Sequence, residues 1–289
     1  MRVARGVGER ARSILRSVFD DLIATAFPAD CRVCGESLVR ASVVPVCDGC
    51  RAAPRPQTMA LCRSCGEALD MESVRFEAQY PAEGLLCHPC RMVPPMFERA
   101  VAYAVYQDEL REMIHLLKYE RMSGVAKMLG QQLAAAILTL RGAAARELVV
   151  MPVPLFPAKQ RQRGYNQAEL LADAAVAALR RFDPGWKLLR MDGVLTRRRD
   201  TESQFALTPR GRRRNLDGAF AVDASRLRAG CEVLLIDDIF TSGATARECS
   251  RVLRRAGAAK VWVATLSRAQ AVDVALWDGH ATGVAQGFG

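Results

Sequence analysis

Residues 233–245 constrain the fold more than any other part of the chain. They read Val-Leu-Leu-Ile-Asp-Asp-Ile-Phe-Thr-Ser-Gly-Ala-Thr. The four aliphatic residues at 233–236 predict a strand that is buried on both faces, as in a parallel sheet. Two acids and a turn of small residues follow, and then a helical pattern begins. We therefore expect an α/β domain in which Asp237 and Asp238 lie at the carboxyl end of a central strand.

The turn after the two acids predicts an anion site. It opens a helix, and the first backbone N–H groups of a helix have no partners within it, so they favour a phosphate. The turn comprises Thr241, Ser242, Gly243, Ala244 and Thr245. Two carboxylates beside such a loop suit a phosphorylated sugar. A purely structural acid pair, a phospho-acceptor and a bare magnesium site are the alternatives.

The same pattern predicts how the helix continues. Cys249, Val252, Leu253 and Ala256 recur at the spacing of one helix face, and Gly257 follows as a stop signal. Cys249 is therefore expected in the core.

Eight of the ten cysteines form four C-x-x-C pairs, and these predict metal sites. Cys-Arg-Val-Cys-Gly-Glu-Ser-Leu at 31–38 recurs as Cys-Arg-Ser-Cys-Gly-Glu-Ala-Leu at 62–69, so the pairs belong to an internal repeat. The sequential assignment places one metal on Cys31, Cys34, Cys47 and Cys50 and another on Cys62, Cys65, Cys87 and Cys90.

Four thiolates at this spacing suit two structural Zn²⁺ ions in closed tetrahedral sites. Disulfides, an iron–sulfur cluster and an interleaved use of the pairs remain alternatives. His88, inside the last pair, is expected to be a bystander. Because this region has few apolar residues, we expect it to need the metals in order to fold.

Composition and sequence pattern suggest four regions. These are an amphipathic N-terminal helix at 1–27, a double zinc ribbon at 28–95, an α/β domain at 96–270 and a tail at 271–289. The helix is expected to dock on its own protein, with attachment to a membrane surface as the alternative. No apolar run is long enough to span a bilayer. The net charge of +10 favours polyanionic partners without identifying one.

Further periodic segments complete the predicted α/β domain. Aliphatic and alternating runs predict strands at 100–106, 148–151 and 261–266. Helices are expected with an apolar face at 110–117, at about 123–140 and from about 168. His115 lies off the apolar face of the first of these helices.

A second anion site is predicted after the strand at 148–151. Its loop contains Lys159, Arg161, Arg163 and Gly164 between a strand end and a helix start. This loop should lie on the same sheet edge as the acid pair and could hold a pyrophosphate, unless its basic residues are merely solvated.

Residues 196–214 carry seven arginines and two acids. Such a run is a solvated loop, a flap over the ligand, or a track for a nucleic-acid backbone.

Together these motifs resemble the bacterial ComF family, and residues 233–245 resemble the signature of type I phosphoribosyltransferases. The resemblance spans residues 20–268. Besides the cysteines and the acid-pair motif, it rests on Lys118-Tyr119, Pro152-Val153-Pro154, Arg163-Gly164-Tyr165-Asn166-Gln167, Arg199 to Thr201, Gln204, Leu207 and Asn215. It implies a type I phosphoribosyltransferase-like parallel-sheet domain preceded by a small zinc-ribbon domain.

The resemblance also implies a ligand and a setting. The acid pair would bind the ribose hydroxyls of phosphoribosyl pyrophosphate (PRPP), taken up with Mg²⁺, and the loop 241–245 would wrap its 5-phosphate. Lys159, Arg161 and Arg163 would hold the pyrophosphate, and Asp237, Asp238 and Arg163 would be the catalytic residues. Family members are competence proteins, which implies a cytoplasmic location and action on single-stranded DNA beside the DNA-uptake machinery. Whether pentosyl transfer from PRPP occurs is open. The alternatives are a non-catalytic adaptor that senses PRPP and binds DNA, and a phosphoribosyltransferase of nucleobase metabolism.

Overall fold

The structure is a computed structural model that describes residues 30–38, 44–69, 85–200 and 216–270. The helix predicted at 1–27, the tail at 271–289 and residues 201–214 of the arginine-rich run lie outside the described residues, as do Gln204, Leu207 and Asn215.

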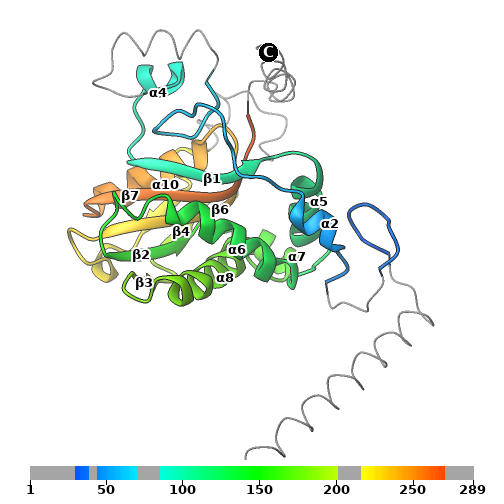
Figure 1. The fold of residues 1–289 in the computed structure, drawn as a ribbon. Coiled ribbons are helices and arrows are strands. Elements are labelled where there is room, and N and C mark those ends of the chain that lie inside the picture. The colour runs from blue at the N-terminus through cyan, green and yellow to red at the C-terminus, as the bar shows by residue number, and fades with distance from the viewer. Residues whose placement is uncertain (1–29, 39–43, 70–84, 201–215, 271–289) are drawn as a thin grey trace, which may run out of the picture. The chain divides into compact units, whose positions relative to one another are not determined.

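Helices and strands alternate through the larger part of the described chain (Figure 1). The helices are α2 (Asp48–Ala52), α4 (His88–Met92), α5 (Asp108–Tyr119), α6 (Val125–Leu138), α7 (Pro157–Arg163), α8 (Gln167–Phe182) and α10 (Ala244–Arg255), with a 3₁₀ turn at Ala224–Arg226. The strands are β1 (Arg99–Val105), β2 (Glu147–Pro152), β3 (Lys187–Arg190), β4 (Leu195–Arg197), β5 (Phe220–Val222), β6 (Glu232–Phe240) and β7 (Lys260–Arg268).

Five strands form one sheet in the order β1-β7-β6-β2-β3, and every pair is parallel (Figure 1). Residues 233–236 in β6 are completely buried, as the aliphatic run predicts. The parallel sheet and the cysteine-rich region confirm the predicted fold class. The predicted helix face at 110–117 is also buried, and His115 is exposed.

The strand order creates a crevice between β2 and β6. Helix α8 leads from β2 to β3, whereas α10 leads from β6 to β7 in the opposite direction across the sheet. Because such crossovers are right-handed, the two helices cover opposite faces. Ligands of open α/β sheets bind where the direction reverses, at the carboxyl ends of the strands. In this sheet that point lies between β2 and β6.

Each face of the sheet has its own packing layer. Val149, Val233 and Val261 belong to a core that also contains Cys249 and Leu253 of α10. Cys249 is 0% exposed, as predicted. On the opposite face α6 lies close to α8, because a Cβ added at Gly130 would come within 2.3 Å of the Cβ of Ala174.

Three elements depart from the sequence-based expectations. Residues 157–163, predicted as loop, form the short helix α7, which begins at a proline and ends at Gly164 in the left-handed conformation. β3 and the antiparallel hairpin of β4 and β5 were not predicted. The hairpin strands are only three residues long, which is too short to show a period.

The chain divides into two compact units. One comprises residues 1–54 and 108–125, and the other comprises residues 55–107 and 126–289. The first four ligand cysteines therefore fall in one unit, and the other four fall in the unit of the sheet. The boundaries that motifs predict at 27, 95 and 270 remain predictions. No helix among the described residues has the length and apolar character needed to cross a bilayer.

Candidate functional site

The two cysteine clusters share one local construction. In the first cluster, the N–H of Cys31 donates to the carbonyl of Glu36, and the N–H of Gly35 donates to the carbonyl of Cys31. The second cluster repeats both hydrogen bonds, from Cys62 to Glu67 and from Gly66 to Cys62. The second C-x-x-C of each cluster then begins a five-residue helix, α2 or α4. The repeat seen in the sequence is therefore a repeat in three dimensions.

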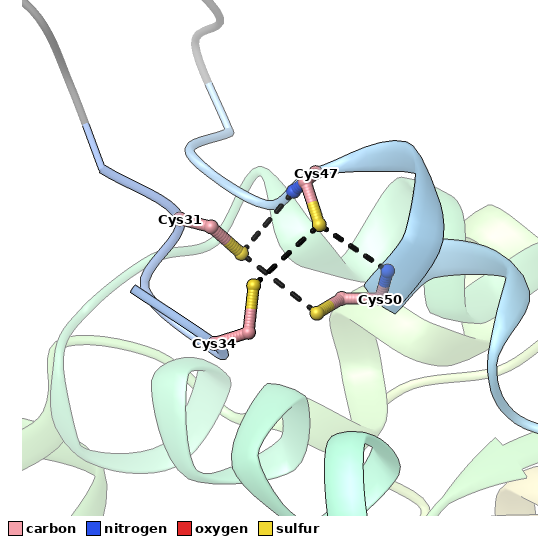
Figure 2. A group of neighbouring side chains, drawn as sticks. All are labelled: Cys31, Cys34, Cys47 and Cys50. Carbon is pink, nitrogen blue, oxygen red and sulfur yellow. Dashed lines mark hydrogen bonds between the residues drawn. The ribbon is translucent and has the colours of Figure 1, made fainter. Parts of the chain in front are cut away.

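The sulfur atoms gather in two groups of four, with ligand atoms within 4.8 Å of one another in each (Figure 2 shows the first). The groups are Cys31, Cys34, Cys47 and Cys50, and Cys62, Cys65, Cys87 and Cys90. The cysteines pair sequentially, not in the interleaved arrangement.

Sulfur separations in both groups fit a tetrahedral metal site. The Sγ atoms of Cys34 and Cys47 are 3.7 Å apart, and those of Cys65 and Cys87 are 3.6 Å apart. Tetrahedral thiolates about 2.3 Å from Zn²⁺ are about 3.8 Å apart, whereas disulfide-bonded sulfurs are about 2.0 Å apart. All ten cysteines are free. Both clusters could therefore bind a metal ion.

The thiols of the second cluster shift one another's pKa values through hydrogen bonds. Hydrogen bonds with Cys65, Cys87 and Cys90 lower the pKa of Cys62, and the hydrogen bonds with Cys62 raise the pKa values of the other three. Four thiolates this close together need a cation. All four are buried, whereas Cys34 of the first cluster is exposed.

The acid pair lies where β6 extends beyond the carboxyl end of its neighbour β2. The pairing of β2 with β6 ends at Pro152 opposite Ile236, and Val153 N–H makes one more bond to the carbonyl of Ile236. β6 continues to Phe240, paired with β7, and so extends four residues beyond its predicted end at 236. Asp237 and Asp238 are thus part of the strand, and they border the crevice.

The two carboxylates have different surroundings. Asp237 lines a cavity of about 20 Å³, together with Val153, Gly243 and Thr245. Its side chain accepts a hydrogen bond from the backbone N–H of Asp238 at 2.9 Å. Asp238 is 4% exposed, and it does not line that cavity. Side chains of neighbouring strand residues point to opposite faces, which accounts for the difference.

The loop 241–245 has the features of an anion cradle. Helix α10 begins at Ala244 after Gly243, and no side chain caps its N-terminus. The Ser242 hydroxyl oxygen is buried and has no hydrogen-bond partner among the described residues. The enclosed cavity holds no more than about one water molecule, so a sugar phosphate would lie across the rim of the loop.

A larger cavity of about 220 Å³ is lined by Pro152 and Pro154, the two residues that flank Val153 in the chain. Its walls come from the segment between β2 and α7, the start of α8, the chain after β3, and β4. The charged residues that line it are Glu169, Asp192 and Arg197.

The three basic residues predicted to bind pyrophosphate line neither cavity. Lys159 forms an ion pair with Asp200 at 3.1 Å, and Arg163 donates a hydrogen bond to Gln167 at 2.7 Å. Arg161 is exposed on α7. They lie on the segment that follows the carboxyl end of β2, the strand that pairs with β6 just before the acid pair.

Asn166, one of the motif residues, has a structural role. It is 1% exposed, caps α8 by accepting from Ala168 N–H, and donates to the carbonyl of Val153 at 3.0 Å. Asn166 therefore fixes the segment after β2 against the start of α8.

Arg197 is a candidate site residue that sequence reasoning missed. It lies on β4 with its guanidinium 5.4 Å from the centre of the Phe220 ring. Burial lowers its pKa, while the charge of Asp237 opposes that effect. Arg197 thus lines the larger cavity and interacts electrostatically with Asp237, which lines the smaller cavity. The sequence does not distinguish Arg197 from the neighbouring arginines of the run, because its position depends on the pairing of β4 with β5.

Cys249 beneath the acid pair is not a reactive thiol. Burial raises its pKa well above the usual value, and the charge of Asp237 adds to this. A thiol that stays protonated is a poor nucleophile.

Comparison with known proteins identifies a set of relatives. The DNA utilization protein YhgH of Salmonella typhimurium is 31% identical over 226 residues, which covers 77% of this chain and 90% of that protein. YhgH of Escherichia coli O6:H1 is 33% identical over 228 residues, with the same coverage. Competence protein F of Haemophilus influenzae is 28% identical over 227 residues, covering 78% of this chain and 90% of that protein. No family model matches the chain.

Proposed function

We propose that this chain, which belongs to the ComF family of competence and DNA utilization proteins, binds PRPP with Mg²⁺ at the crevice between β2 and β6 and acts on incoming single-stranded DNA. The observation that carries the ligand assignment is the junction of Asp237 and the loop 241–245 at the point where the strand order reverses. A carboxylate beside a helix N-terminus is complementary to a ribose that carries a 5-phosphate.

The described residues fit such a ligand. The Ser242 hydroxyl and the first N–H groups of α10 would bind the 5-phosphate, and Asp237 would bind the ribose hydroxyls. Asp238 would support Asp237 through its backbone N–H and could reach the ribose if the strand end moves. Arg197, with Lys159, Arg161 and Arg163 from the segment after β2, would face the pyrophosphate. Mg²⁺ bound with PRPP would neutralise part of the pyrophosphate charge.

We further propose that both cysteine clusters hold Zn²⁺. The sulfur separations and the sequential grouping support zinc, and a closed set of four thiolates gives the ion no open position for catalysis. The metals would be structural.

The reaction we propose is pentosyl transfer, in which pyrophosphate leaves ribose C1. The protein would contribute by positioning the ribose and stabilising charge. The alternative is a non-catalytic adaptor that senses PRPP and binds DNA. The names of the relatives favour this adaptor, because that of YhgH mentions DNA utilization and neither name mentions a transferase activity. Either role would be carried out in the cytoplasm, next to the DNA-uptake machinery.

Calorimetric titration with PRPP and Mg²⁺ tests the ligand assignment. Asp237→Asn and Asp238→Asn should each weaken binding at least about tenfold, because a neutral amide loses charge-assisted hydrogen bonds worth about 1.5–3 kcal/mol. Glu147→Gln, which removes a carboxylate near the amino end of β2, is the matched control. If both aspartate variants bind PRPP as the wild type does, the site is wrongly assigned.

Pyrophosphate release separates the two roles. A transferase should release pyrophosphate from PRPP when single-stranded DNA or a nucleobase is present, and Asp237→Asn should abolish that release. An adaptor should bind PRPP without any release.

Salt dependence tests the DNA part. Charge reversal at Arg212, Arg213 and Arg214 should lower affinity for single-stranded DNA and reduce the log–log salt slope by about 0.7 for each phosphate that the protein no longer neutralises. An unchanged slope would exclude this segment from DNA binding.

A further inference from the structure

The second cysteine cluster is in direct contact with helix α10. Arg247, in the first turn of α10, donates one hydrogen bond to the carbonyl of Val93 at 2.8 Å and another to the Sγ of Cys90 at 3.7 Å. Cys90 is 2% exposed and Arg247 is partly exposed, so the contact between them is partly buried. One arginine thus joins a ligand of the cluster to the helix whose N-terminus forms the loop 241–245.

Arg268 makes a second connection between the cluster segment and the end of β6. It is 4% exposed and forms an ion pair with Glu67, two residues beyond the cluster ligand Cys65. Its guanidinium lies 4.5 Å from the centre of the Phe240 ring. Phe97, which follows the last C-x-x-C, packs edge-on against the same ring with centroids 6.1 Å apart.

Phe240, which Arg268 and Phe97 contact, is itself in contact with the loop 241–245. Its ring lies so close to Gly243 that a Cβ added there would be 2.5 Å from the ring Cζ. The backbone between Cys62 and Cys65 is also bound to the sheet, since the N–H of Ala100 in β1 donates to the carbonyl of Ser64 at 2.7 Å. The loop is therefore held between the cluster and the end of β6.

We propose that Arg247 and Arg268 are positioning residues through which the metal in the second cluster holds the loop 241–245 in the conformation that binds phosphate. Four thiolates around a divalent metal carry two negative charges in excess, which the two arginines partly neutralise. Without the metal the four sulfurs no longer form one fixed anionic group, so Arg247 loses its sulfur partner. The segment that carries Glu67, the partner of Arg268, is then no longer fixed, and the ring of Phe240 loses its support. The proposal rests on the PRPP assignment for its ligand, but not for its structural part.

The first cluster supplies an internal control. It belongs to the other compact unit, and Arg32 beside Cys31 forms an ion pair with Glu120 of that same unit at 2.5 Å. Loss of its metal should leave the loop unchanged.

Hydrogen exchange tests the structural part without any ligand. Amides at 240–247 should exchange at least about tenfold faster in Cys65→Ser, which removes a ligand of the second cluster, and at the wild-type rate in Cys34→Ser. Because Cys65→Ser could unfold the sheet domain, Arg247→Met is the second variant, and Arg255→Met, exposed on the same helix, is its control. Equal exchange in Arg247→Met and Arg255→Met would overturn the proposal.

Linkage tests the functional part. If the metal positions the loop, PRPP must in turn retain the metal, by the same factor of about 5–150. At equilibrium with a competing chromogenic chelator, PRPP should therefore raise the fraction of zinc that stays in the second cluster in the wild type but not in Arg247→Met. If PRPP binds the wild type and this fraction does not change, the coupling is wrong while the PRPP assignment stands. If PRPP does not bind at all, the PRPP assignment fails, and the exchange rates alone decide the structural part.

Discussion

Gly243 meets two demands that together exclude every other amino acid. Its φ is 71°, in the left-handed region that side chains rarely adopt, and the ring of Phe240 fills the space that a Cβ would need. Gly230, at the amino end of β6, has a φ of 74° with nothing within 4 Å of an added Cβ. Both glycines have the left-handed backbone conformation, and only at Gly243 would an added Cβ also collide with a neighbouring side chain.

This pair gives the first prediction. Gly230→Ala should cost about 1–2 kcal/mol of unfolding free energy from backbone strain alone. Gly243→Ala should cost more than this and should also weaken PRPP binding, because Phe240 must move or the loop must open. Urea unfolding and calorimetry measure the two effects. A Gly243→Ala variant no less stable than Gly230→Ala would contradict the packing described here.

Arg197 gives the second prediction. Its half-buried guanidinium acts on Asp237, and the residue lines the larger cavity. Arg197→Met removes this charge and its contact with the Phe220 ring but keeps an unbranched side chain of similar length, so it should weaken PRPP binding about tenfold. Arg181→Met, an exposed arginine at the end of α8, should bind PRPP as the wild type does. Equal affinities of the two variants would remove Arg197 from the site.

Residue roles were predictable where the sequence neighbours are also the structural neighbours. The acid pair, the loop after it and the cysteine pairs are of this kind. Arg247 and Arg268 are not, because their partners Cys90 and Glu67 lie 157 and 201 residues away in the sequence. No local pattern records such contacts.

At the scale of elements, α10 is tied to the β4–β5 hairpin by one carboxylate. Glu248 accepts hydrogen bonds from Arg251 at 2.6 Å and from the backbone N–H of Gly218 at 2.9 Å. Burial alone would raise the pKa of Glu248, but these hydrogen bonds outweigh burial and lower it. The folded protein therefore keeps this group ionised at a pH where the unfolded chain would protonate it.

The third prediction concerns pH. Because the folded pKa is the lower one, the stability from Glu248 should be fully present above about pH 4.5, the usual pKa of a glutamate, and be lost as pH falls through the folded value. Glu248→Gln should cost about 1–3 kcal/mol at pH 7 and less at pH 3. Denaturant unfolding at both pH values measures this, with exposed Glu98→Gln as control. A pH-independent cost would mean that charge has no part in this contact.

The predictability of elements follows their length and burial. β6 and α10 carry long aliphatic or periodic patterns, and both were found from the sequence. α7 is polar on all sides and has no buried residue, so no apolar face marks it. β3 and the hairpin strands have three or four residues, and they form because partners far along the chain pair with them.

At the scale of the whole molecule, the two clusters differ in setting although they are built alike. The second is buried within the unit of the sheet, and the first has an exposed ligand, Cys34. We predict about two zinc ions per chain, one of them released much faster to a chelator, since water and chelator reach exposed thiolates first.

Elemental analysis and time-resolved chelation measure this fourth prediction, and Cys34→Ser should remove the fast phase alone. A protein without metal, whose cluster thiols are oxidised in pairs, would exclude both zinc sites.

The β4–β5 hairpin brings together the two ends of the arginine-rich run, because Arg198 N–H bonds the carbonyl of Ala219 at 2.9 Å. A stretch whose ends are fastened this closely can change in length at small entropic cost. It can therefore be shortened to a tight turn or exchanged for the matching stretch of another ComF protein without disturbing the sheet. Evolution can use the same freedom, so relatives can diverge in this stretch while keeping the same parallel sheet.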